Sequence, residues 1–315
     1  MAMTAERVTA EEYEKLVPDR RVFFNEPRFT ELNREKAEEV HYLILRRDAS
    51  ARFGVILGKT GDMIKCPWSA PYSYPVEIKR NEKVESVDEA LAALEDYCRG
   101  IGGKTVRFIF PPLFYDEHLL SAWVSAFYRT GYTVANLDLS YALDLDDLSR
   151  EGYEKDLPEK GRKGLRKAKA SGLTIQKCET DEEIAEAYGI IRANHDAKGR
   201  PTHMSLEQVM DTLKLVPHDV FIVRHGADAV VSEILYRVND RIVQGIYTGT
   251  LDEFAQYNGM NFLTDYTIRY YHDLGYRILD KATATEDSVP NRGLCNFKES
   301  VGCRRSLKYT FIKDL

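Results

Sequence analysis

The chain has 315 residues, a net charge of −6 and 43% hydrophobic residues. This length is sufficient for two domains of ordinary size, and the composition is typical of globular proteins with enough apolar side chains for two cores. Bulk binding to DNA needs a surplus of positive charge, so the negative charge argues against a DNA-binding protein and leaves only a local basic patch as a site for nucleic acid.

The sequence also argues against a membrane protein and a secreted one. No apolar run approaches the roughly 20 residues that span a bilayer. The first residues, MAMTAERVTAEEYEKLV, resemble neither a signal peptide nor a transit peptide. The cysteines are irregularly spaced and odd in number, which argues against a disulfide framework; they are Cys66, Cys98, Cys178, Cys295 and Cys303. We therefore expect a cytoplasmic protein with reduced thiols.

Several strands and helix starts are predicted along the chain. Segments rich in β-branched or aromatic residues and bounded by turn-forming residues are predicted strands; they are 40–45, 52–57, 104–110, 220–224, 230–238 and 241–247. A hydroxyl residue followed three positions later by Glu or Gln predicts a helix start with a capping box. The pairs are Ser86 with Glu89, Thr180 with Glu183, and Ser205 with Gln208.

The two halves of the chain repeat one order of elements: helix, glycine, strand, helix, glycine, strand. The glycines are Gly103 and Gly131 in the first half and Gly275 and Gly302 in the second, so their spacing is similar in the two halves. Glycine often ends a helix because it adopts the left-handed conformation without strain. We therefore predict a mixed α/β fold in two similar domains, 1–145 and 155–315, with the boundary between Asp144 and Tyr153.

Two segments resemble a known family. The basic run KGRKGLRKAKASG (160–172) and the ending NRGLCNFKESVG (291–302) are similar to those of the FemAB-type tandem acetyltransferase superfamily, especially its acetyltransferase-like members. The resemblance covers most of the chain after Glu38. It implies two tandem domains with the fold of GCN5-related N-acetyltransferases (GNAT), each a mixed, mostly antiparallel sheet flanked by helices. The C-terminal domain is then expected to hold the donor site, and the N-terminal domain to be non-catalytic.

The resemblance also implies an activity. Some members of the family transfer an amino acid from aminoacyl-tRNA to an amine of a cell-wall precursor, and others are expected to use acyl-CoA. We therefore expect an N-acyltransferase with a thioester or ester donor, and a small-molecule amine or a cell-wall-precursor-like molecule as acceptor. Acyl-CoA and aminoacyl-tRNA both stay open as donors. The alternative from another class is a non-catalytic ligand-binding protein that retains the fold.

The turn QYNGMN is the predicted donor site. In domains of this family the corresponding turn holds the donor's pyrophosphate at the N-terminus of the central helix. The expected donor-binding residues are Gln256, Asn258, Gly259, Met260 and Asn261. Asn258 and Asn261 stand where acyl-CoA enzymes of the family often have glycine or another small residue, which departs from their pattern. The alternative is a plain helix start with asparagine as its cap.

Four residues are candidates for catalysis. Lys298, which the resemblance matches together with Gly293 and Phe297, is expected to stabilise the negative charge that develops on the reacting carbonyl oxygen; the alternative is a lysine on a surface helix. An acceptor amine must also lose a proton. Glu233, inside the apolar strand VVSEILY, and Asp280, at the end of the strand YRIL, are the candidate bases. Strand alternation leaves the orientation of Glu233 undecided, and a solvated carboxylate is the alternative.

The remaining candidates concern the leaving group, the substrates and metals. Tyr247 is a candidate proton donor to the leaving group, with packing in the core as the alternative. The basic segment offers Arg162 and Arg166 to the phosphates of a tRNA or of an anionic precursor; a solvated helix that balances the acidic linker is the alternative.

In the loop CPWSAPYSYP, Trp68, Tyr72 and Tyr74 are expected to form a wall for a sugar or apolar substrate, or else to pack inside the protein. His195, Asp196 and His203 have side chains that bind metals, but their spacing fits no standard site. We therefore expect no metal.

Overall fold

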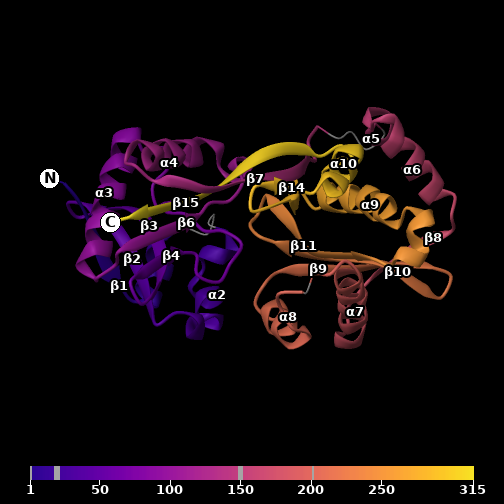
Figure 1. Ribbon diagram of the computed structural model, residues 1–315, viewed down its shortest axis with the longest axis horizontal. Helices are drawn as coiled ribbons and strands as arrows, with labels where there is room; N and C mark the ends of the chain where they lie inside the picture. Colours follow the sequence, from indigo (N-terminus) through magenta and orange to yellow (C-terminus); the bar gives the residue numbers. More distant parts are fainter. Residues whose placement is uncertain (1, 18–21, 148–151, 201) are drawn as a thin grey trace. The chain divides into compact units, whose positions relative to one another are not determined.

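The computed structural model describes residues 2–17, 22–147, 152–200 and 202–315. The chain divides into two compact units (Figure 1). Unit 1 comprises Met1–Leu139 and Ser306–Leu315, and unit 2 comprises Ser140–Arg305. Among the described residues, no helix combines the length and the hydropathy of a membrane-spanning segment.

Unit 1 is an α/β unit with one main sheet. Its strands are β1 (Met3–Val8), β2 (Glu39–Arg47), β3 (Ser50–Thr60), β4 (Met63–Cys66), β5 (Val76–Glu77), β6 (Thr105–Ile109) and the first part of β7 (Thr133–Asp144). Its α-helices are α1 (Ala10–Leu16), α2 (Pro27–Leu32), α3 (Val84–Gly100) and α4 (Glu117–Arg129), with 3₁₀ turns at Phe23–Asn25, Arg34–Lys36 and Leu113–Tyr115. The strand order runs β1-β2-β3-β4-β6 and continues with the end of β15 (Arg304–Asp314). β4 pairs with β6 in parallel, whereas the pairs β1–β2, β2–β3, β3–β4, β3–β5 and β6–β15 are antiparallel.

Aromatic side chains fill the core of unit 1. The ring of Phe127 on α4 lies 5.0 Å from the rings of both Phe108 and Phe110. It also lies 5.2 Å from the ring of Phe311 on β15. Phe311 is fully buried, so the end of the chain contributes to the core of unit 1 and does not merely cover the edge of its sheet.

Unit 2 has helices on both faces of its sheet (Figure 1). Its strands are β8 (Leu173–Lys177), β9 (His218–His225), β10 (Asp228–Arg237), β11 (Ile242–Thr250) and β12 (Ile278–Thr283), with a small hairpin of β13 (Thr285–Glu286) and β14 (Val289–Pro290). Its helices are α5 (Tyr153–Asp156), α6 (Glu159–Lys169), α7 (Asp181–Ala197), α8 (Leu206–Leu213), the 3₁₀ helix η4 (Asp252–Tyr257), α9 (Gly259–Asp273) and α10 (Arg292–Ser300). The strand order is β8-β9-β10-β11-β12 and then the end of β7. Helices α7 and α8 lie on one face, and α6, α9 and α10 on the other.

The last strand of each half pairs in the sheet of the other unit. In unit 1, β6 is antiparallel to the end of β15, and in unit 2, β12 is antiparallel to the end of β7. The observed units therefore differ from the predicted ranges: residues 306–315 belong to unit 1, and the segment from Ser140 to Asp144 belongs to unit 2. An alternating pattern predicts that a segment is a strand, but it does not select the strand's partner.

Two of the three predicted capping boxes are confirmed. Thr180 and Glu183 cap α7, and Ser205 and Gln208 cap α8, with both reciprocal hydrogen bonds present. The prediction for Ser86 is wrong, because α3 begins earlier, at Val84, and Ser86 is buried in its first turn. The Glu89 carboxylate accepts a hydrogen bond from Arg47 of β2 at 2.9 Å. A tertiary ion pair thus occupies the side chain that a local cap would need.

The glycines of α6 explain how closely its neighbours approach it. A Cβ atom on Gly161 would lie 1.7 Å from the carbonyl oxygen of Ser300, at the end of α10. A Cβ atom on Gly164 would lie 3.2 Å from the side-chain amide nitrogen of Asn261, in the first turn of α9. Gly161 and Gly164 therefore let the end of α10 and the start of α9 pack directly against α6.

We predict that Gly161→Ala destabilises the protein by about 1–3 kcal/mol, because the added methyl group forces α6 away from a backbone carbonyl. Gly100→Ala is the matched control, since Gly100 is also a helical glycine and its Cβ would meet no atom within 4 Å. The free energy of unfolding in urea measures both variants. Equal free energies of unfolding for the two variants would contradict the prediction.

Candidate functional site

The site begins where two parallel strands separate. β11 and β12 pair at only three positions, Ile242 with Ile278, Val243 with Leu279, and Gln244 with Asp280. Beyond these positions β11 continues beside β10, and β12 pairs with β7. The carboxyl ends of parallel strands are where open α/β sheets place their ligands. The separation therefore leaves room for a ligand between strands that are each held in place on their other side.

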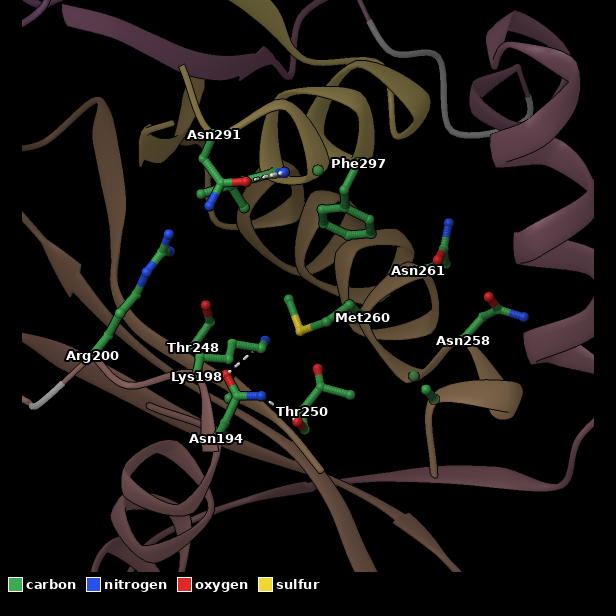
Figure 2. A pocket seen from close by; sticks show the side chains of 15 residues that line it. Asn194, Lys198, Arg200, Thr248, Thr250, Asn258, Met260, Asn261, Asn291 and Phe297 are labelled. Atoms are coloured by element: carbon green, nitrogen blue, oxygen red, sulfur yellow. Dashed lines mark hydrogen bonds between the residues drawn. The ribbon is translucent and has the colours of Figure 1, made fainter. Parts of the chain in front are cut away.

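A cavity of about 630 Å³ opens next to this separation (Figure 2). The end of β11 provides one part of its wall, through Thr248, Gly249 and Thr250. The end of α7 and the segment after it, Ala255 of η4, and the starts of α9 and α10 provide the rest. Among the described residues that line it, none is acidic.

The N-terminus of α9 reaches the cavity without a side-chain cap. Asn258 precedes the helix in the left-handed conformation, with φ of 52°, and its side chain does not cap the helix. The first N–H groups of a helix have no acceptor within the helix and carry partial positive charge. A Cβ atom on Gly259 would lie 2.6 Å from Val231 of β10, so only glycine lets the helix start so close to the sheet. This end of α9 is suited to bind an anion.

Two cations and a second helix start also line the cavity. Lys198 donates a hydrogen bond to Asn194 at 3.2 Å, and Asn194 in turn donates to the carbonyl of Thr250. Arg200 lies at one side of the cavity, and the start of α9, with Asn258 and Asn261, lies at the other (Figure 2). Because Lys198 and Arg200 line the cavity and its described lining includes no carboxylate, the described wall is electropositive in a protein of net charge −6.

The start of α10 completes the wall. Asn291 caps this helix by accepting the N–H of Leu294 at 3.1 Å, and Asn291, Gly293, Leu294 and Phe297 all line the cavity. Sequence reasoning did not select Lys198, Arg200 or Asn291. The signal for the two cations was the segment NHDAKGR, which was considered only for metal ligands. Within the described ranges, no cluster of three or more His, Cys, Asp and Glu side chains is arranged to hold a metal.

The predicted donor turn lies partly on this wall. Asn258, Gly259, Met260 and Asn261 line the cavity. Gln256 does not, because its side chain is exposed on η4; its backbone carbonyl accepts a hydrogen bond from the side chain of Asn258 at 3.4 Å.

Lys298 is not a surface lysine. Its side chain is buried behind the wall, and its Nζ donates hydrogen bonds to the carbonyl oxygens of Ala282 at 3.0 Å and Thr283 at 2.8 Å. The ammonium also lies 5.6 Å from the ring of Tyr141. Burial lowers the pKa of Lys298 to about 8. The structure therefore rules out the surface alternative, although Lys298 does not itself line the cavity.

The two candidate bases are also buried and do not line the cavity. Glu233 forms an ion pair with Lys281, with Oε1 and Nζ 2.5 Å apart, and its Oε2 has no hydrogen-bond partner. Asp280 accepts the backbone N–H of Ala282 at 2.8 Å. The alternative of a solvated Glu233 is therefore wrong. Tyr247 is half-buried outside the cavity, and burial raises its pKa to about 12.

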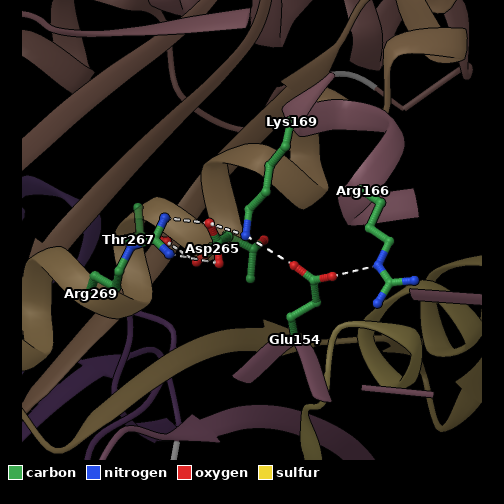
Figure 3. Close-up of polar contacts among 7 residues, drawn as sticks. Glu154, Arg166, Lys169, Asp265, Thr267 and Arg269 are labelled. Atoms are coloured by element: carbon green, nitrogen blue, oxygen red, sulfur yellow. Dashed lines mark hydrogen bonds and ion pairs between the residues drawn. The ribbon is translucent and has the colours of Figure 1, made fainter. Parts of the chain in front are cut away.

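Arg166 is occupied by a charge network on α6 (Figure 3). Its Nε donates to Glu154 at 2.6 Å, and Glu154 also pairs with Lys169 at 3.3 Å. Lys169 lies 3.5 Å from Asp265, which pairs with Arg269. The hydrogen bond from Arg166 holds the pKa of Glu154 below its usual value.

Arg162 reaches only the backbone carbonyl of Lys155, at 3.5 Å. The placements of Arg162 and Arg166 favour the alternative in which the helix is solvated and its charges are balanced.

The aromatic loop belongs to unit 1, where two of its tyrosines are core residues. Tyr72 and Tyr74 are 1% and 5% exposed, and Tyr72 donates a hydrogen bond to the hydroxyl of Tyr115 at 2.6 Å. Trp68 is partly buried, and its indole N–H donates to the carbonyl of Asn33 at 3.0 Å. The expected substrate wall is therefore corrected for Tyr72 and Tyr74, because packing leaves them almost no free surface.

The pKa of Lys298 predicts how stability depends on pH. The unfolded chain binds a proton on this lysine up to about pH 10.5, whereas the folded protein releases it near pH 8, so stability rises with pH between these values. Relative to Lys298→Met, the free energy of unfolding of the wild type should increase by about 1.6 kcal/mol from pH 8 to 9.5. Urea unfolding at both pH values measures it. The exposed Lys163→Met is the control, and a pH-independent difference between wild type and Lys298→Met would contradict the prediction.

Comparison with known proteins identifies the kind of domain that unit 2 contains. Residues 159–288, all within unit 2, match the family model of the acetyltransferase (GNAT) domain. None of the curated proteins matches the chain. Among solved structures, FemX is similar with a TM-score of 0.70 and 10% identity, over 99% of this chain and 97% of FemX.

Two further solved structures are similar over most of their length. A tandem GNAT protein from the clavulanic acid biosynthesis pathway has a TM-score of 0.53 and 9% identity, over 99% of this chain and 98% of its own. The C-terminal domain of a candidate lysylphosphatidylglycerol synthetase from Agrobacterium fabrum has a TM-score of 0.61 and 14% identity, over 97% and 92%. The chain therefore has a FemAB-like fold of two tandem GNAT-type domains, with the matched acetyltransferase domain in unit 2.

Proposed function

We propose that the protein is an N-acyltransferase that moves an acyl or aminoacyl group from a thioester or ester donor to an amine, with the chemistry in unit 2. The observation that carries this proposal is the cavity beside the separation of β11 and β12. Its wall, as far as the structure describes it, has an uncapped helix start, the cations Lys198 and Arg200, and no carboxylate. A donor that carries phosphate groups and an uncharged reactive carbonyl is complementary to such a wall.

The donor-binding residues fit coenzyme A despite their departure from the family pattern. Asn258 adopts the left-handed conformation that glycine would supply. Gly259 keeps the close approach of α9 to β10, so the N–H groups at the helix start stay directed at the ligand. Gly259, Met260, Lys198 and Arg200 would hold the phosphates, and the bound donor would supply a thioester carbonyl. Aminoacyl-tRNA offers phosphates of the same chemistry and is the second donor to test.

The chain's own groups would act mainly by positioning and polarisation. Lys298 has three N–H donors, of which two are bound to backbone carbonyls. The third is the group that we assign to the developing negative charge on the carbonyl oxygen. Between the two carboxylates, Glu233 has an oxygen without a hydrogen-bond partner and is the better acceptor of the amine's proton. The acceptor that we propose is an amine or a cell-wall-precursor-like molecule, as the family resemblance implies.

One observation favours the alternative of a non-catalytic ligand-binding protein. Lys298, Glu233 and Asp280 all lie behind the cavity wall. A protein that only binds a phosphate-containing ligand needs the cavity and does not need these residues to reach it. Mass spectrometry of candidate amines incubated with the protein and either acetyl-CoA or aminoacyl-tRNA separates the two functions, because only the enzyme produces an acylated amine.

We expect acetyl-CoA to raise the melting temperature, since a ligand present at 100 times its Kd stabilises the native state by about 2.7 kcal/mol. Arg200→Ala and Lys198→Ala should reduce this shift, because each removes a cation from the wall. Lys163→Ala, an exposed lysine of α6, should not. If millimolar acetyl-CoA and coenzyme A leave the melting temperature unchanged, coenzyme A is not the donor.

We expect Lys298→Ala to lower kcat by about 10²–10³ while donor affinity stays nearly unchanged, because the contact forms mainly as charge develops. Lys298→Arg should restore little activity, since a planar guanidinium cannot replace a compact ammonium between two carbonyls. Steady-state kinetics with the acylated amine as product provide the measurement. A fully active Lys298→Ala would remove this residue from the mechanism.

A further inference from the structure

The end of β12 has an unusual backbone conformation. Ala282 has φ of 61°, in the left-handed region that residues other than glycine rarely adopt. The carboxylate of Asp280 accepts the N–H of Ala282 at 2.8 Å, two residues along the chain. Such a local bond from an aspartate supports a turn in place of a regular strand. The pairing of β12 with β7 is irregular at this point, between Asp280 and Thr283.

This turn allows two neighbouring carbonyls to bind one ammonium. In a regular strand, successive carbonyl groups point to opposite sides. Here the carbonyl oxygens of Ala282 and Thr283 lie 3.0 Å and 2.8 Å from the same Nζ, that of Lys298. The turn at Ala282 is what brings them together.

Two occupied N–H donors determine the direction of the third. An ammonium group is tetrahedral and rotates freely unless its donors are bound. In Lys298 the two carbonyls stop that rotation, and the ring of Tyr141 lies 5.6 Å from the nitrogen. Asp280 and Lys298 are both buried, so water does not replace these bonds easily.

We propose that Asp280 is a positioning residue for Lys298: its carboxylate maintains the left-handed turn at Ala282, and the turn directs two carbonyls that orient the ammonium. The catalytic consequence rests on the proposed function, in which Lys298 polarises the reacting carbonyl. This role replaces that of general base for Asp280, because the carboxylate oxygen is already bound to the backbone.

The first test uses no donor. Brief treatment of the protein with acetic anhydride at pH 8, followed by peptide mass spectrometry, gives the labelling of Lys298 relative to the exposed Lys163. We expect Asp280→Ala to raise this ratio about fivefold or more, because the turn opens and exposes the amine. Asp280→Asn retains an oxygen that accepts the N–H of Ala282 and should stay near the wild type. Ala282→Gly should also stay near it, since glycine adopts this φ without strain.

A matched control loses the same kind of bond elsewhere. Asp116 of unit 1 accepts the backbone N–H of Leu119 at 3.1 Å. Asp116→Ala should leave the labelling of Lys298 unchanged. Unchanged labelling in Asp280→Ala would overturn the proposal. Equal labelling in Asp280→Ala and Asp280→Asn, both above the wild type, would also overturn it, because charge and not the bond to Ala282 would then hold the lysine.

The second test uses turnover of the acetyl-CoA reaction. We expect Asp280→Ala to lower kcat about tenfold or more with the KM for the donor unchanged, and Asp280→Asn to restore most of it. If Asp280 were a general base, both variants would instead lose activity. An inactive Asp280→Asn in which Lys298 is labelled no more than in the wild type would therefore overturn the positioning role. If labelling behaves as expected and no amine is acylated, the arrangement of Lys298 holds and the proposed function fails.

Discussion

The separation of β11 and β12 is the constraint on which the arrangement of unit 2 depends. Two parallel strands that share only three paired positions must satisfy the rest of their backbone groups elsewhere. β11 does so with β10 and β12 with β7, so each strand stays fixed while the space between them opens. The exchange of the last strands matters for this reason. Without the end of β7 as a neighbour, β12 would have no paired strand beyond Asp280, and nothing in its own sheet would hold its end.

The separation also explains why charged side chains are buried in this part of unit 2. Glu233, Asp280, Lys281 and Lys298 carry two negative and two positive formal charges, and all four are almost completely buried. A buried ion pair seldom adds net stability, but removing one partner costs about 3–5 kcal/mol because the other charge remains uncompensated. Gly245 of β11 gives Glu233 its room, since a Cβ atom there would lie 2.7 Å from Oε1. Burying these charges together costs free energy of folding, and so does removing one of them. This favours a functional reason for the presence of the cluster.

The sequence predicted those features that depend on neighbours along the chain. The caps at Thr180 and Ser205 are local, and their structure agrees with the pattern. Ser86 fails because Glu89 is taken by Arg47, which lies 42 positions away in the sequence. The orientation of Glu233 could not be decided from alternation, because helices cover both faces of its sheet and both faces of β10 are buried. No sequence pattern predicts that Lys198 and Arg200 belong to the site, because they follow α7 without regular periodicity. Only the folded chain brings them opposite α9 and α10.

The predicted donor turn can be divided into the physical requirements of its separate positions. Position 258 needs a left-handed backbone, which asparagine tolerates better than most residues. Position 259 needs the absence of a side chain, because Val231 lies within 2.6 Å of the place where a Cβ would be. Position 261 needs a side chain that fits against α6, and Gly164 provides the space for Asn261 there. A turn with one glycine can therefore meet the same requirements as a glycine-rich one, provided that the glycine stands where the sheet is closest and its partners on α6 are small.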